Sequence, residues 1–137
     1  MAMSEVRTKV PDTEKITINL GVIDLGQIDL LVQEGFYSNR TDLIRTAIRN
    51  QLVAHADVLR QTAARRTLVL GLQEFSKRDL EAVRKSRTKL RIQVLGLVRI
   101  SDDVSPALAR ETIESIAVLG ALHASAAIKA TLADRIR

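Results

Sequence analysis

The two histidines are the side chains of this sequence best suited to acid–base chemistry. His55 stands two positions before Asp57, and His123 stands two positions before Ser125. A catalytic set needs a nucleophile, a base and a group that orients the base, and neither pair has a third member nearby in the sequence. We therefore expect no enzyme activity and no catalytic residue.

Other chemistries are limited by composition. The chain has no cysteine, which excludes disulfides, thiolate zinc sites, iron–sulfur clusters and cysteine nucleophiles. Because only two histidines remain to offer imidazole, we expect no metal site and no cofactor. Aromatic residues make up 2% of the chain, too few for a platform on which single-stranded RNA or DNA could stack.

The length, composition and charge of the sequence indicate a small folded protein. With 137 residues, 46% of them hydrophobic, the chain is about one domain long, or two small modules that complete their cores with a second copy. The net charge of +5 permits phosphate binding without requiring it. No apolar stretch is long enough for a membrane span and the first residues are polar, so we expect a cytoplasmic protein without membrane contact.

The N-terminal part of the sequence begins with an arm and a single strand. Residues 1–14 show no periodicity and contain Pro11, which predicts a flexible arm. Residues 15–20 then alternate strictly, which is typical of a β-strand with one apolar and one polar face. The apolar face holds Ile16, Ile18 and Leu20, and the polar face holds Lys15, Thr17 and Asn19.

Two helices follow this strand. Residues 22–34 have apolar side chains at helical spacing, and Gly35 is placed to terminate that helix. Ser38 is a good N-cap for a second helix, which carries an apolar stripe from Leu43 to Leu52 and continues towards Arg66. A lone strand leaves backbone groups unpaired, so we expect a symmetric dimer that pairs the strand with its copy. Residues 15–55 form this domain, and residues 56–66 form a helical linker.

The remainder, residues 67–137, contains an internal repeat. The triplet Val-Leu-Gly begins at Val69, Val94 and Val118, in steps of 25 and 24 residues. A serine follows each valine after seven positions, and an aliphatic residue follows after fourteen. Each unit is predicted to be a short strand and then a serine-capped helix: residues 77–85 after Ser76, 106–112 after Ser101 or Ser105, and 126–135 after Ser125.

Three such units predict a short parallel β/α solenoid-like module. The period resembles that of leucine-rich repeats in architecture, without the asparagine ladder of that family. The ends of such a stack are apolar and open, so we expect higher homo-oligomers through residues 67–137. The fold class expected for the whole chain is α+β.

Residues 15–52 resemble the ribbon-helix-helix family of DNA-binding proteins, the CopG/Arc/MetJ group. Residues 15–20 (Lys-Ile-Thr-Ile-Asn-Leu) are similar to the family's ribbon, and residues 35–49 are similar to its turn and second helix. The resemblance implies a homodimer whose antiparallel ribbon enters the major groove of double-stranded DNA. On this basis Lys15, Thr17 and Asn19 would read base edges, since Lys donates to guanine and Asn pairs with adenine.

The resemblance also implies phosphate contacts at the start of the second helix. Ser38, Asn39 and Arg40 are the candidates there, because free backbone amides and the helix dipole favour a phosphate oxygen. A basic run between the first two repeats is a weaker candidate, since such runs are usually solvated faces. The secondary phosphate candidates are Arg45, Arg84, Lys85 and Arg87.

The leading hypothesis is therefore a sequence-specific, nucleoid-associated transcriptional regulator that acts as a repressor. Two alternatives remain open. An antitoxin would use the same DNA-binding unit and block a toxin with the rest of its chain, although such tails are commonly polar and disordered. An architectural protein would polymerise through open repeat ends and bind DNA with little sequence preference.

Overall fold

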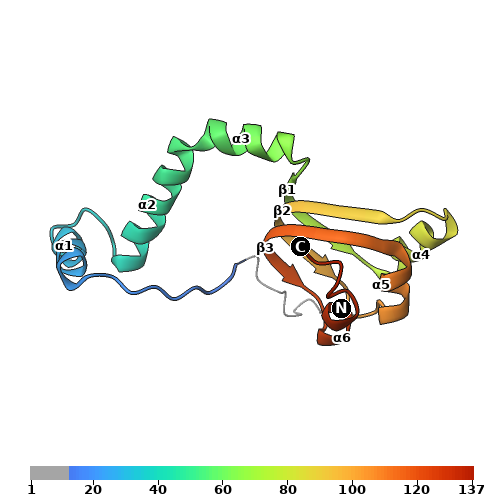
Figure 1. Ribbon diagram of the computed structural model, residues 1–137. Helices are drawn as coiled ribbons and strands as arrows, with labels where there is room; N and C mark the ends of the chain where they lie inside the picture. Colours follow the sequence, from blue (N-terminus) through green and yellow to red (C-terminus); the bar gives the residue numbers. More distant parts are fainter. Residues whose placement is uncertain (1–12) are drawn as a thin grey trace, which may run out of the picture. The chain divides into compact units, whose positions relative to one another are not determined.

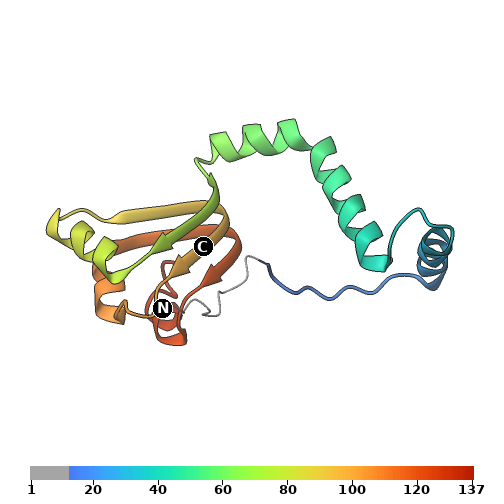
Figure 2. The ribbon, with the colours of Figure 1, turned by 180° about the vertical axis from the view of Figure 1, so that it is seen from behind.

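The computed structural model describes residues 13–137, which divide into an N-terminal unit, residues 13–62, and a C-terminal unit, residues 63–137. The predicted arm, residues 1–14, lies almost entirely outside the described part of the chain. Figure 1 and Figure 2 show helices in the first unit and a sheet with helices in the second. The mixture of helices and parallel strands confirms the expected α+β class.

The N-terminal unit contains α1 (Val22–Gln33) and α2 (Arg40–Ala54), followed by the start of α3 (Ala56–Arg65). Gly35, with φ +85, ends α1 as expected, and the Phe36 amide bonds back to the Leu31 carbonyl. Residues 13–21 carry no assigned secondary structure in the single chain. The predicted strand at residues 15–20 needs a second copy as its partner, so it stays a prediction.

The start of α2 differs from the expectation. The helix begins at Arg40, and Asn39 is its N-cap instead of Ser38, because the Asn39 side chain accepts a hydrogen bond from the Asp42 amide. The Ser38 amide in turn donates to the Asp42 carboxylate at 2.9 Å. Serine and asparagine both cap helices well. The cap lies one position later than predicted because the Asp42 amide bonds to the Asn39 side chain, while the Asp42 carboxylate bonds to the Ser38 amide.

The C-terminal unit alternates strands and helices. Their order is β1 (Val69–Phe75), α4 (Lys77–Lys85), β2 (Leu90–Ile100), α5 (Pro106–Thr112), β3 (Ile113–His123) and α6 (Ala126–Thr131). The strands form one parallel sheet in the order β1-β2-β3. The three Val-Leu-Gly triplets lie side by side, since Val69 pairs with Val94 and Val94 with Val118.

The aligned glycines explain why the triplet recurs. Gly71, Gly96 and Gly120 all have positive φ, between +125 and +144. A Cβ on Gly96 would lie 2.2 Å from the Gly71 carbonyl oxygen, and a Cβ on Gly120 would lie 2.0 Å from that of Gly96. A side chain at the two inner positions therefore meets both a conformational and a steric barrier.

Serine side chains cap the three helices that follow the strands. Ser76 accepts from the Asp79 amide in a reciprocal capping box, Ser105 accepts from the Leu108 amide, and Ser125 accepts from the Ile128 amide. Of the two candidates for the middle helix, Ser105 is therefore the cap and Ser101 is not. Proline at the first position of α5 supports this start.

The core of the C-terminal unit lies between one face of the sheet and these helices. Leu80 of α4, Leu108 of α5 and Ile128 of α6 are buried against Val94 and Val98 of β2 and their neighbours. Burying a side chain of this size contributes about 1.5–3 kcal/mol each. The unit thus has a core of its own within a single chain.

One edge of the sheet is partly covered by residues near the C-terminus. Ile116 of β3 forms a bridge with Ile136, with the Ile116 amide bonded to the Arg135 carbonyl at 2.9 Å. The last helix accordingly ends at Thr131, before the predicted residue 135, because the following residues cover this edge. The expectation of two open ends is wrong for this edge, which is partly covered.

Candidate nucleic-acid interface

The side chains expected to read bases are exposed. Lys15, Thr17 and Asn19 lie at the surface of residues 13–21. The apolar positions between them are exposed as well, with Ile16 75% and Ile18 59% accessible. Because polar and apolar side chains of this segment are both exposed, nothing among residues 13–137 of the single chain covers its apolar face.

The same holds for the helices of this unit. No residue of α1, α2 or α3 is buried. Large apolar side chains are exposed along α1, α2 and the connection between them, among them Val22, Ile23, Leu30, Phe36, Ile48 and Leu52. A unit that folds without burying one side chain of its helices is incomplete, because burial is the dominant favourable term in folding.

Ser38, Asn39 and Arg40, the predicted phosphate contacts at the start of α2, are here called the phosphate clamp, and intrachain contacts already use part of it. The Asp42 carboxylate accepts from the Ser38 amide, so this backbone donor is occupied. The Asn39 side-chain oxygen is the helix cap. Ser38 and Asn39 are nonetheless exposed, and the Ser38 hydroxyl and the Asn39 side-chain amide are the groups that a phosphate oxygen would meet.

Arg40, the third member of the clamp, connects the two helices. Its Nε and Nη2 atoms donate to the two carboxylate oxygens of Asp29 at 2.8 and 2.9 Å. This bidentate pair is favourable in geometry. The hydrogen bonds from Arg40 lower the pKa of Asp29, and the same bonds raise the pKa of Arg40. A phosphate at Arg40 would therefore meet a guanidinium whose charge Asp29 already balances.

On α2, Arg45 is better placed than Arg40 to contact a phosphate. It is exposed and forms no ion pair with any described residue. Arg49 lies one helical turn further along and is exposed in the same way. Arg49 is not among the residues predicted from the sequence, although its spacing of four residues from Arg45 was a usable signal.

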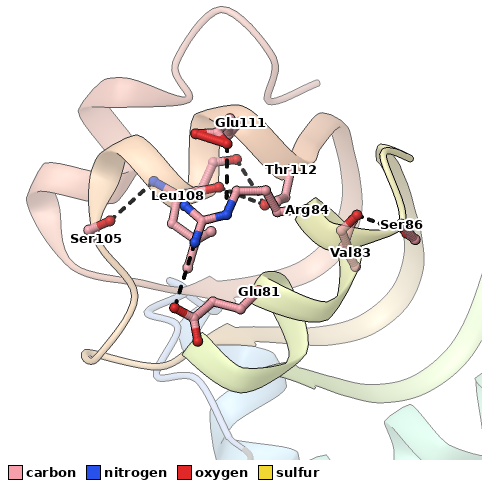
Figure 3. A network of polar contacts seen from close by, with 9 residues as sticks. Glu81, Val83, Arg84, Ser86, Ser105, Leu108, Glu111 and Thr112 are labelled. Atoms are coloured by element: carbon pink, nitrogen blue, oxygen red, sulfur yellow. Dashed lines mark hydrogen bonds and ion pairs between the residues drawn. The ribbon is translucent and has the colours of Figure 1, made fainter.

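The secondary candidates of the basic run lie in the C-terminal unit. Figure 3 shows Arg84 of α4 between Glu81 on its own helix and Glu111 on α5, at 3.8 and 3.9 Å. Arg84 thus links two helices of the core. Lys85 and Arg87 are exposed, and Arg87 has φ +57 in the turn after α4.

His55 and Asp57, one of the two histidine pairs considered from the sequence, contact other groups in the structure. The His55 Nδ1 atom lies 3.0 Å from the Gln51 carbonyl oxygen, and Asp57 pairs with Arg60 at 3.0 Å. Among residues 13–137 there is no group of three or more metal-ligating side chains. Within the same residues, no helix has the length and apolar character needed to cross a membrane.

Comparison with known protein families gives one finding. The model of a family described as the ribbon-helix-helix transcriptional regulator family matches residues 11–129. This match confirms the resemblance inferred from residues 15–52, and it continues through most of the C-terminal unit. Neither the curated proteins nor the solved structures contain a match to the chain.

Proposed function

The chain belongs to the ribbon-helix-helix transcriptional regulator family, and we propose that it is a repressor that binds operator DNA as a homodimer. In this proposal residues 15–20 of two copies pair as an antiparallel ribbon and enter the major groove, which is about 12 Å wide. The observation that supports it most is the N-terminal unit without a buried side chain in its helices.

Pairing with a second copy would supply the missing core. Ile16, Ile18 and Leu20 would pack on the exposed apolar side chains of α1 and α2 from both copies. Each accessible apolar Å² removed from water contributes about 25 cal/mol. Because the strand obtains its hydrogen-bond partner in the same step, dimerisation and folding of this unit would be coupled.

The same pairing would order the polar face of the ribbon. Lys15, Thr17 and Asn19 would project together from both strands toward base edges. Lys donates to guanine, Asn pairs with the N6 and N7 groups of adenine, and Thr offers a hydroxyl and a methyl group. A two-fold symmetric dimer would then prefer a two-fold symmetric site.

Phosphate contacts would hold this ribbon in register. Ser38, Asn39 and Arg45 are the contacts that the geometry favours, because their side chains are exposed in and near the first turns of α2. Arg40 would mainly position α2 against α1 through Asp29. Such contacts fix orientation and carry little sequence information.

The C-terminal unit would join dimers into a larger assembly on neighbouring half-sites. A second contact made by a linked dimer is effectively intramolecular, which raises the apparent affinity by about 10²–10⁴. The C-terminal residues that cover the edge of β3 favour a closed assembly over the open polymer of an architectural protein.

Selection of bound fragments from a random duplex pool tests this function. At a fixed salt concentration, we expect enrichment of one two-fold symmetric motif, because the same three polar side chains from each copy would read the two half-sites. The Asn19→Ala chain serves as the matched control and should enrich a less restricted motif. Recovery of no motif with the unaltered chain would contradict the proposal.

A further inference from the structure

The sheet of the C-terminal unit has a second face, opposite its helices. Alternate residues of a strand point to opposite faces, and Val94, Val98 and Val118 belong to the core with the helices. The intervening positions therefore point away from the helices. We call the set of apolar side chains at these positions the outer sheet face: Leu70, Leu72, Leu95, Leu97, Leu119 and Ala121.

Solvent reaches much of this face. Leu70 is 79% exposed, Leu72 49% and Leu119 46%. Leu97, on the central strand between Leu72 and Ala121, is 9% exposed. None of the six side chains belongs to the core cluster formed with α4, α5 and α6. Three adjacent strands thus present contiguous leucines without a covering layer from the described helices.

Charges surround the outer sheet face at both ends and leave its centre apolar. Toward the carboxyl ends of the strands, Arg99 pairs with Glu74 at 3.4 Å. Toward the amino ends, Arg91 pairs with Glu114 at 2.8 Å. Each of these charges forms an ion pair within the same chain. To a binding partner, the face therefore presents leucine side chains and little net charge. Such a face is complementary to another apolar face.

The small size of the face decides which partner fits. Strands lie about 4.8 Å apart, and successive residues on one face lie about 7 Å apart, so six positions cover on the order of 200 Å². A stable free-standing interface buries about 800 Å² per partner. A partner for this face therefore has to be held close by another contact, and the N-terminal dimer would hold a second copy at an effective concentration in the mM range.

We propose that the outer sheet face packs against the same face of a second copy of this chain. Two facing sheets would interdigitate their leucines at a separation of about 10 Å. The proposal rests on the proposed function for the N-terminal dimer, which brings the copies together. This pairing joins the two chains of one dimer, so a contact that joins dimers would use another surface of residues 67–137, such as the edge of β1.

Crosslinking of the full chain tests this surface, because the sequence lacks cysteine. Leu95 lies on the central strand, so two-fold pairing of the faces places the two Leu95 positions close together. We expect the Leu95→Cys chain to form a crosslinked dimer with a short bis-maleimide reagent. The control is Ala107→Cys on α5, an exposed position on the helix side, which should crosslink at least about tenfold less.

A second substitution tests whether the leucines provide the contact. Adding Leu70→Glu to the Leu95→Cys chain should lower the crosslinked yield about tenfold or more, because the charge would be desolvated in the paired state. Adding Ala107→Glu should leave the yield unchanged. Leu70 is 79% exposed, so the unfolding temperature of the C-terminal unit should change little, and it should be measured for each chain.

The outcomes separate this proposal from the proposed function. A Leu95→Cys yield equal to that of Ala107→Cys would overturn the pairing, and so would insensitivity to Leu70→Glu. Specific DNA binding by the Leu70→Glu chain together with lost crosslinking supports both. Crosslinking without any specific DNA site in the unaltered chain would leave the pairing standing and contradict the proposed function alone.

Discussion

The two units of the chain differ in how much apolar surface they bury on their own. The C-terminal unit has a core in which Val94, Ile113 and Ile128 are at most 1% exposed. The helices of the N-terminal unit bury no residue, and Ile16 and Val22 are 75% and 83% exposed. A sheet backed by three helices forms a core within one chain, whereas the helices and the extended segment of the N-terminal unit do not.

This difference indicates which of the two units needs a second copy of the chain in order to fold. Helices as short as α1 and α2, of 12 and 15 residues, are marginal without tertiary packing. Within the N-terminal unit, one well-formed link between them is the surface pair of Arg40 and Asp29, and exposed ion pairs contribute little. The N-terminal unit should therefore depend on association, and the C-terminal unit should not.

The largest effect is expected from Gly96→Ala in the C-terminal unit. The new Cβ would lie 2.2 Å from the Gly71 carbonyl oxygen, and φ +144 disfavours any side chain, so we expect a loss of about 4 kcal/mol or more. Chemical denaturation monitors the change. Gly26→Ala is the control, since its Cβ meets no atom within 4 Å and α1 should gain about 1 kcal/mol. Equal effects of both changes would refute this account of the glycines.

The second effect is expected from Ile18→Glu in the N-terminal unit. A carboxylate between the ribbon and the helices would be buried without a partner, which costs several kcal/mol in the dimer and little in the monomer. Light scattering should show loss of the ribbon dimer, and circular dichroism should show loss of helix. Lys15→Gln, on the opposite face of the strand, should leave the molecular mass of the dimer in solution unchanged. An unchanged mass for Ile18→Glu would argue against the ribbon.

A smaller effect distinguishes the two kinds of DNA contact. Asn19→Ala should weaken binding to the preferred site by about 1–3 kcal/mol and relax the base preference at one position. Arg45→Ala should weaken all sequences alike and reduce the salt slope by about 0.9 for each Arg45 that contacts a phosphate. Binding titrations at several salt concentrations measure both. If Asn19→Ala weakened every sequence equally, the base-reading role would be wrong.

The smallest effect concerns the link between α1 and α2. Because Arg40 lowers the pKa of Asp29 below its ordinary 3.8, the pair stabilises the fold at neutral pH, and this contribution disappears as the pH falls through the lowered pKa. The unfolding temperature of Asp29→Asn should therefore lie slightly below that of the unaltered chain at pH 7. The difference should shrink below about pH 4. If the difference in unfolding temperature became larger at acidic pH, the Asp29–Arg40 pair would not stabilise the fold in the way described.

Features with a local pattern could be predicted from the sequence. The Val-Leu-Gly spacing predicted three strands, and the structure pairs these triplets in one register. The end of α1 at Gly35 and the caps at Ser76 and Ser125 follow from short-range chemistry. The family match confirms the resemblance read from residues 15–52.

Features that depend on distant residues could not be predicted. Arg40 and Asp29 are 11 positions apart, and no local rule indicates that a clamp candidate would pair with a carboxylate on the preceding helix. The choice of Asn39 over Ser38 depends on the Asp42 side chain, which bonds to both. The bridge between Ile116 of β3 and Ile136 joins residues 20 positions apart, so the partial cover of this edge could not be predicted from local sequence.

The central claim is that residues 15–20 pair with a second copy, and amide hydrogen exchange of the full chain tests it most directly. Among residues 13–137 of the single chain, these amides have no partner strand. In an antiparallel ribbon, alternate amides of this segment bond to the partner, so the account predicts slow exchange at every second position. Exchange of all six amides at the rate of an unstructured peptide, at concentrations where the chain binds DNA, would contradict it.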